Sequence, residues 1–357
     1  MNKPQFAIVV IILLVVASAS ALYLGLGHYK TPSSTLTTPT TMTAGNNYTI
    51  RITDSMALPS VGERFDHMSI DIPAQLVFIA ARGNNSVYVA NLVTEGIERI
   101  ITGLNEPQGV YYVQQYDKLY VSNGGDGTVD VFDASNYHLL KVLNFSGDAD
   151  NIRYDSSSGL LYVGYGEENQ SGIGIINAMS DKVVGNIPLN GHPEAFSLEQ
   201  NGTSIFVNVP TANAIEVASK VNRTVIASWP LTNATENFPM ALDEKNNRLF
   251  VGFGLPPILS VYDTNTGKVV SDINISSAAD DIYFDPITKL VFVSCSTGYL
   301  DVIKQQDADS YRPLITLPTG PLARTSLFYP EQEELFVAVP QHDGLSALLL
   351  TFSIRNY

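Results

Sequence analysis

Two short runs of carboxylates are the residues best suited to chemistry in this sequence. Asp148 and Asp150 lie in the segment SGDADN, and Asp280 and Asp281 lie in SAADDI. Ca²⁺ prefers several carboxylate or carbonyl oxygens at about 2.3–2.6 Å, and either run can begin such a shell. Neither run completes a known pattern, because the residues after Asp150 lack the later oxygen ligands of an EF-hand loop. No cofactor is expected from these patterns, and Ca²⁺ or another divalent cation is the one candidate to test.

Two histidines stand beside carboxylates and add secondary candidates. His67 follows Asp66, and His192 precedes Glu194 by two positions. Each pair has the residue types of a general acid–base couple, and equally those of an ordinary solvated rim. Asp66, His67 and Glu194, together with Arg324, are therefore candidates for contact with a cation or ligand.

Several classes of function find no support in the sequence. No His-Glu-x-x-His, Cys-x-x-Cys, Gly-x-Ser-x-Gly or P-loop motif occurs. A formal net charge of −15 argues against a nucleic-acid partner, which needs clustered Lys and Arg. The lone cysteine, Cys295, excludes an intramolecular disulfide framework, so stability must come from a hydrophobic core.

A sequence repeat indicates which β-strands position these residues. An apolar strand-like segment recurs seven times along the chain, with one aromatic residue in register every 42 to 44 residues. These aromatic residues are Phe78, Tyr120, Tyr162, Phe206, Phe250, Phe292 and Phe336. Such a period with several short strands per unit is typical of propeller blades, because one four-stranded blade cannot bury both faces alone. The sequence predicts an all-β, seven-bladed β-propeller.

One repeat unit carries a family resemblance. LYVSNGGDGTVDVFD (119–133), opened by EPQGV (106–110), resembles the repeat of the YVTN-repeat (YncE-like) β-propeller family. The resemblance weakens in other units but persists in RLFVGF (248–253) and LVFVSC (290–295). It implies the seven-bladed fold and, because family members include periplasmic and surface proteins, an exported protein. It implies no particular activity.

The last repeat unit has no fourth strand of its own after Phe352. The segment Tyr48 to Thr53, running on to Pro59, resembles the outer strand of unit six at 313–318. We therefore expect an N-terminal strand to close the last blade, which leaves no strand edge open. The propeller domain is predicted over residues 47–357.

The placement of the carboxylates in this repeat predicts an electronegative channel mouth. The two runs occupy the same loop, before the innermost strand, in units three positions apart, so they should face each other across the ring. Converging carboxylates attract cations, although a solvated acidic face is the plainer interpretation.

The N-terminal segment is different in kind. Residues 6–27 are apolar and, at about 1.5 Å per residue, long enough to cross the ~30 Å hydrocarbon layer. We expect a transmembrane signal anchor there, with residues 1–5 in the cytoplasm and a Thr/Ser/Pro-rich stalk at 28–46. A small-residue site at 17–21 keeps a cleaved signal peptide as the alternative. Both interpretations place the propeller outside the cell, and the anchor would make it a single-pass protein of the cell membrane.

Asn-x-Ser/Thr sequons fit an exported protein, and the blade map places them in loops or on outer strands. The candidate glycosylation sites are Asn47, Asn84, Asn144, Asn169, Asn201, Asn222, Asn233 and Asn274.

Two functional classes remain open. The first is a non-catalytic module that binds an extracellular protein, glycan or small ligand through loops at the channel mouth. The second is a lactonase-like hydrolase with carboxylates, and a divalent cation, in the channel. The loops contain no recognisable nucleophile arrangement, and a fold is not evidence of activity, so the binding module is the favoured prediction.

Overall fold

The computed structural model describes residues 42–44, 48–59, 61, 64–167 and 170–356. The predicted N-terminus 1–5, the apolar segment 6–27 and residues 28–41 of the predicted stalk lie outside the described residues, as do the sequons Asn47 and Asn169. Within the part of the chain that is described, no helix has the length and apolar character needed to span a membrane.

Seven antiparallel sheets form the seven blades, which confirms the all-β propeller predicted from the repeat. Blade 1 contains β3 (Met68–Asp71), β4 (Leu76–Ala81), β5 (Ser86–Asn91) and β6 (Gly96–Thr102). Blade 2 contains β7 (Pro107–Val113), β8 (Lys118–Asn123), β9 (Thr128–Asp133) and β10 (Leu139–Asn144). Blade 3 contains β11 (Ala149–Asp155), β12 (Leu160–Tyr165), β13 (Gly172–Asn177) and β14 (Lys182–Pro188).

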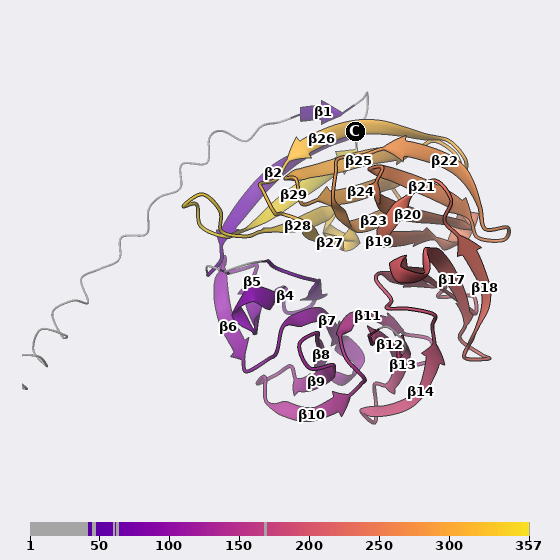
Figure 1. Ribbon diagram of the computed structural model, residues 1–357. Coiled ribbons are helices and arrows are strands. Elements are labelled where there is room, and N and C mark those ends of the chain that lie inside the picture. Colours follow the sequence, from indigo (N-terminus) through magenta and orange to yellow (C-terminus); the bar gives the residue numbers. More distant parts are fainter. Residues whose placement is uncertain (1–41, 45–47, 60, 62–63, 168–169, 357) are drawn as a thin grey trace, which may run out of the picture. The chain divides into compact units, whose positions relative to one another are not determined.

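The next three blades repeat this order. Blade 4 contains β15 (Phe196–Leu198), β16 (Ser204–Val209), β17 (Ala214–Ser219) and β18 (Thr224–Pro230). Blade 5 contains β19 (Thr235–Asp243), β20 (Arg248–Leu255), β21 (Ile258–Asp263) and β22 (Lys268–Asn274). Blade 6 contains β23 (Ala279–Asp285), β24 (Leu290–Cys295), β25 (Tyr299–Gln305) and β26 (Tyr311–Pro318). Figure 1 shows the blades following one another in chain order around the channel.

Blade 7 combines strands from both ends of the described chain. It contains β27 (Thr325–Tyr329), β28 (Glu334–Val339) and β29 (Leu348–Asn356), followed by β2 (Tyr48–Ala57) and β1 (Met42–Ala44). β2 runs antiparallel to β29 from the pair Tyr48–Asn356 to the pair Ala57–Leu348. β1 pairs with β2, so residues 42–44 form a strand where the sequence predicted the end of a stalk.

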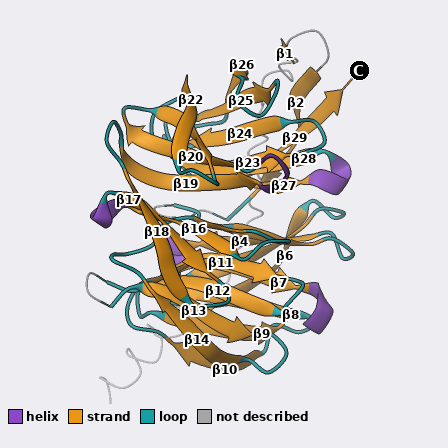
Figure 2. Cartoon of the chain, turned by 90° about the vertical axis from the view of Figure 1, so that its right-hand side faces the viewer, coloured by secondary structure: helices purple, strands orange, loops and turns teal. Residues whose placement is uncertain are grey.

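Helical structure among the described residues is limited to single 3₁₀ turns, as the side view in Figure 2 shows. These are η2 (Arg82–Asn84), η3 (Gln114–Tyr116), η4 (Pro210–Ala212), η5 (Glu244–Asn246) and η6 (Pro330–Gln332).

The core lies between neighbouring blades, and the repeat aromatics are at its centre. All seven lie on the second strand of their blade and are at most 2% exposed. Phe292 of blade 6, for example, shares a cluster with Leu335 and Phe352 of blade 7. Each blade therefore buries an apolar face only against its neighbour, which is why the repeat must be stacked to be stable.

Three buried aspartates at the ends of innermost strands hold turns. Asp155 accepts hydrogen bonds from the backbone N–H groups of Ser157 and Ser158 at 3.0 and 3.3 Å. Asp243 and Asp285 make the same kind of bond within their own turns. These hydrogen bonds give the three carboxylates a structural role in their turns.

Candidate functional site at the channel mouth

A cavity of about 860 Å³ runs along the propeller axis and is lined by residues from all seven innermost strands. Each repeat aromatic pairs with a residue of the innermost strand that stands nine positions before it in the sequence. All seven of these innermost-strand residues line the cavity. We call them the chamber ring: Ser69, Tyr111, Arg153, Ser197, Ala241, Tyr283 and Leu327.

A second set of equivalent positions precedes the chamber-ring residues by three positions in the sequence. We call this set the mouth ring. It consists of Asp66, Gln108, Asp150, Glu194, Phe238, Asp280 and Arg324. Six of these seven side chains are polar, and five of them were named as candidates from the sequence. The mouth ring therefore brings four carboxylates and one guanidinium to equivalent positions around the channel.

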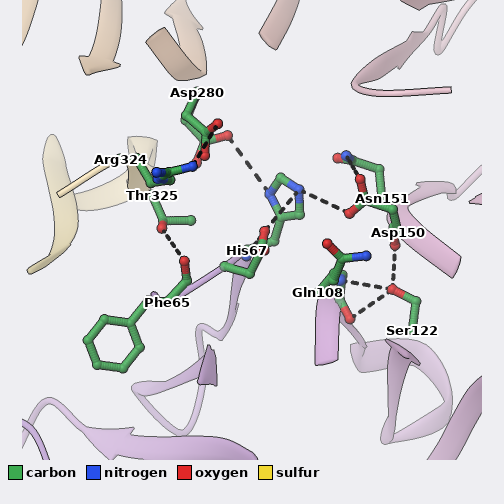
Figure 3. Close-up of polar contacts among 12 residues, drawn as sticks. Phe65, His67, Gln108, Ser122, Asp150, Asn151, Asp280, Arg324 and Thr325 are labelled. Carbon is green, nitrogen blue, oxygen red and sulfur yellow. Dashed lines mark hydrogen bonds and ion pairs between the residues drawn. The ribbon is translucent and has the colours of Figure 1, made fainter. Parts of the chain in front are cut away.

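His67 lies at the centre of the site, between the two carboxylate runs (Figure 3). Its Nε2 lies 3.7 Å from Asp66 Oδ1 and 3.8 Å from Asp150 Oδ1. Its Nδ1 lies 3.9 Å from Asp281 Oδ1. The structure thus brings together one carboxylate from each predicted run, Asp150 and Asp281. His67, a secondary candidate from the sequence, lies between them.

Backbone contacts fix each of these groups. The segment at Asp66 and His67 is hydrogen-bonded to Ala80 of β4, through Asp66 N at 2.7 Å and His67 O at 3.1 Å. Asp281 Oδ2 accepts the backbone N–H of Ser326 at 2.9 Å. The register of the innermost strands shifts between Ala149 and Ile152 and again after Ala279, and such bulges redirect side chains beside sites.

Burial sets the protonation of the site. It lowers the pKa of His67 to about 4, so the imidazole is neutral at pH 7. Burial raises the pKa of Asp150 well above its usual range, and the nearby charge of Asp66 adds to this effect. Burial also raises the pKa of Asp281, against the opposing hydrogen bond from Ser326. A bound cation would stabilise the ionised forms of these carboxylates, which burial disfavours.

The other predicted residues take separate places. Asp148 accepts a hydrogen bond from Gln108 Nε2 at 2.6 Å and lies 3.8 Å from His192 Nε2. His192 therefore pairs with Asp148, whereas the sequence suggested Glu194. Asp280 Oδ1 lies 3.8 Å from Arg324 Nη1.

Glu194 occupies the mouth ring beside His192, and burial raises the pKa of its carboxyl. Two further residues of the site, Arg64 and Gln108, were not among the candidate contacts named from the sequence. Arg64 Nη2 lies 2.7 Å from Asp66 Oδ2 and 3.1 Å from Gln108 Oε1. The repeat itself contained the signal for Gln108, since it stands in the same position as Asp66 and Asp150.

Replacing Asp280 by Asn tests this electrostatic picture. Burial raises the pKa of Asp280 to about 6, against the attraction of Arg324 and with the repulsion of Asp66. Because the unfolded value is about 3.9, ionisation of Asp280 destabilises the fold above about pH 6, and this effect disappears as the pH falls toward 4. We expect Asp280→Asn to unfold at higher urea than wild type at pH 7.5, with most of the advantage lost at pH 4.5. An equal advantage at both pH values would contradict the raised pKa.

Comparison with known proteins supports the fold and leaves the family open. No family model matches the chain. It is 27% identical over 155 residues to the Uncharacterized protein YwhL of Bacillus subtilis (strain 168). That match covers 43% of this chain and 32% of the relative, so the chain spans about a third of the length of the curated relative it matches.

Two solved structures share the architecture. A chain in the crystal structure of the Mitotic Checkpoint Complex superimposes with a TM-score of 0.72 at 12% identity, covering 92% of this chain and 98% of that one. A chain of Kuenenia stuttgartiensis Hydrazine Synthase gives a TM-score of 0.69 at 12% identity, covering 80% of this chain and 94% of that one. At such identities the likeness concerns the fold alone, which is that of a seven-bladed β-propeller.

Proposed function

We propose that the propeller is a non-catalytic binding module that holds a small organic anion in its central chamber. The observation that carries this proposal is the position of Arg153, whose cationic side chain lines a cavity of ligand size. Among the described residues, Arg153 takes part in no ion pair. A volume of about 860 Å³ falls within the range typical of small-molecule sites.

The walls of the chamber define the class of ligand. Tyr111, Tyr154 and Tyr283 line it together with Phe284, so an aromatic or other apolar body has rings to pack against. Arg153 Nη1 donates one hydrogen bond to Ile152 O at 2.9 Å, and its Cζ lies 5.7 Å from the centre of the Phe196 ring. A guanidinium has five N–H donors, so most of its donors are available for a carboxylate. The ligand class is a small carboxylate with an apolar body.

The hydrolase alternative has less support in the geometry. The imidazole of His67 faces three carboxylates, and no hydroxyl or thiol is hydrogen-bonded to it among the described residues. Cys295, the one cysteine, is buried and donates to Ser276 O. Among the described residues, His67 and Cys295 therefore do not form the nucleophile–histidine pair that covalent catalysis needs.

The setting of the module is part of the proposal. The apolar segment 6–27 supports export and a single membrane anchor, with the propeller outside the cell. The six sequon asparagines that the structure describes are exposed, which supports glycosylation: Asn84, Asn144, Asn201, Asn222, Asn233 and Asn274. We also infer membership of the YVTN-repeat family from the segment 119–133, and closure of blade 7 by β2.

Binding of benzoate tests the proposed function. We expect saturation-transfer NMR to show benzoate bound with a dissociation constant on the order of 1 mM, as its size allows, and benzylamine to give no transfer. Arg153→Gln should weaken benzoate binding about tenfold or more, because a hydrogen bond to a charged group contributes about 1.5–3 kcal/mol. Arg312→Gln, an exposed residue of β26, is the control and should bind as wild type does. Equal binding by wild type and Arg153→Gln would refute the assignment.

A further inference from the structure

Three side chains of the channel mouth can supply atoms to one metal ion. Asp66, His67 and Asp150 each offer one ligand atom, and the three atoms lie within 4.8 Å of one another. The distances from His67 Nε2 to the two carboxylates are 3.7 and 3.8 Å. Tetrahedral ligands at about 2.0–2.2 Å from an ion lie about 3.3–3.6 Å apart, so the two distances from Nε2 need only small side-chain movements. We propose that Asp66, His67 and Asp150 bind one divalent transition-metal ion, Zn²⁺ or Mn²⁺ in type.

An unpartnered oxygen points independently to an ion at this place. Asp150 is only 8% exposed, and its Oδ1 accepts no hydrogen bond from the described residues. This same oxygen is the atom that faces His67 Nε2. A buried acceptor without a partner costs about 1–3 kcal/mol, and more when it is charged. Such atoms are rare in native proteins, and a bound ion would satisfy this one.

The groups around the three ligands prepare them for a metal. A metal-bound histidine usually donates its other N–H to a carboxylate, and Asp281 lies 3.9 Å from Nδ1, fixed by Ser326. Arg64 engages Asp66 Oδ2, which leaves Oδ1 on the side of His67. Nε2 is thereby the nitrogen directed at both carboxylates.

The ligand types select the metal. Ca²⁺ takes six to eight oxygen ligands, whereas one imidazole and two carboxylates suit Zn²⁺, Mn²⁺ or Fe²⁺. The three ligands were all candidates from the sequence, Asp150 in one of the carboxylate runs and Asp66 and His67 as secondary candidates. The proposal narrows the expected ion, Ca²⁺ or another divalent cation, to a transition metal. His67 also lines the chamber, so positions on the ion that no protein ligand occupies would face it.

Calorimetry on the full chain, stripped of metal with a chelator, tests the site. We expect one Zn²⁺ per chain with a micromolar or tighter dissociation constant, and Ca²⁺ at least about a hundredfold weaker. Asp150→Asn and His67→Gln should each weaken Zn²⁺ binding about a hundredfold or more, because each removes a ligand. Asp281→Asn should weaken it about tenfold, as outer-shell partners do. Asp148→Asn is the matched control from the same run and should change affinity by less than about threefold.

Absorption of bound Co²⁺ gives a second readout, because the visible bands report nitrogen and oxygen coordination and should change in His67→Gln. Wild-type Zn²⁺ affinity in both Asp150→Asn and His67→Gln, tighter binding of Ca²⁺ than of Zn²⁺, or no binding would overturn the proposal. Arg153→Gln separates this inference from the proposed function, since it should lose benzoate and keep Zn²⁺. Should one variant fail to fold, the other still decides the outcome.

Discussion

Deletion of residues 1–59 is expected to leave the propeller unfolded at 25 °C, whereas deletion of residues 1–46 should leave a cooperatively folded protein. The longer deletion removes β2, which pairs with β29 along its length. It also removes Ile50, Met56 and Leu58, all of them buried. Full burial of one such side chain contributes about 1.5–3 kcal/mol, so three approach the 5–15 kcal/mol that stabilises a typical domain. Circular dichroism during urea unfolding measures the difference.

Ring closure is what this comparison tests, because β2 also joins blade 7 to blade 6. The hydroxyl of Tyr48 donates to Thr288 O at 3.0 Å and accepts from Lys304 Nζ at 2.8 Å. Without β2, the edge of β29 would be exposed and open to pairing with other chains. Equal urea midpoints for the two deletions would show that blade 7 does not depend on β2.

A matched pair of substitutions in the full-length chain isolates the packing contribution. Ile50 is 0% exposed, whereas Ile52 on the same strand is partly buried. Ile50→Ala should lower the free energy of unfolding by about 2–5 kcal/mol, and Ile52→Ala by clearly less. A larger loss at Ile52 would mean that the packing of β2 differs from that seen in the structure.

The fold was predictable because its determinants repeat. One aromatic residue per blade fixed the second strands, and the two strands beside each followed from alternation of apolar and polar residues. All seven aromatics are buried between blades, as a structure of stacked sheets requires. The strand at 42–44 was not predictable, since the Thr-rich segment around it has no apolar period.

The site was only partly predictable, and the reason is local geometry. Adjacent carboxylates are visible in a sequence, but a bulge decides which of two neighbours faces the channel axis. Asp150 and Asp281 lie beside His67, whereas Asp148 pairs with Gln108 and His192.

The chamber arginine was missed for a different reason. Arg153 looks like any strand residue until positions are counted from the repeat aromatic, which shows that it shares its place with Tyr111 and Tyr283. In such a ring, candidate site residues are therefore found by comparing equivalent positions among blades and not by searching for motifs.

Gly109 connects the fold to the site, and its replacement by alanine should damage both. The backbone N–H of Gly109 donates a hydrogen bond to Ser122 Oγ at 2.8 Å, and Ser122 Oγ in turn donates to the backbone oxygen of Asp150. A Cβ added at Gly109 would lie 2.5 Å from Ser122 Oγ and would overlap the Asp150 oxygen. Since the Asp150 atom is backbone, no side-chain rotation relieves the overlap, and β7 and β11 must separate.

We expect Gly109→Ala to lower the free energy of unfolding by about 3 kcal/mol, at the upper end of the cost of overpacking. It should also weaken Zn²⁺ binding about tenfold or more, because β11 carries Asp150. Gly96→Ala is the matched control, since a Cβ there meets only Thr94 O at 3.9 Å. Urea unfolding and Zn²⁺ calorimetry measure the two effects. Wild-type stability in Gly109→Ala would show that blades 2 and 3 do not approach as closely as the structure has them. Lost stability with unchanged Zn²⁺ affinity would separate the position of β11 from the metal site.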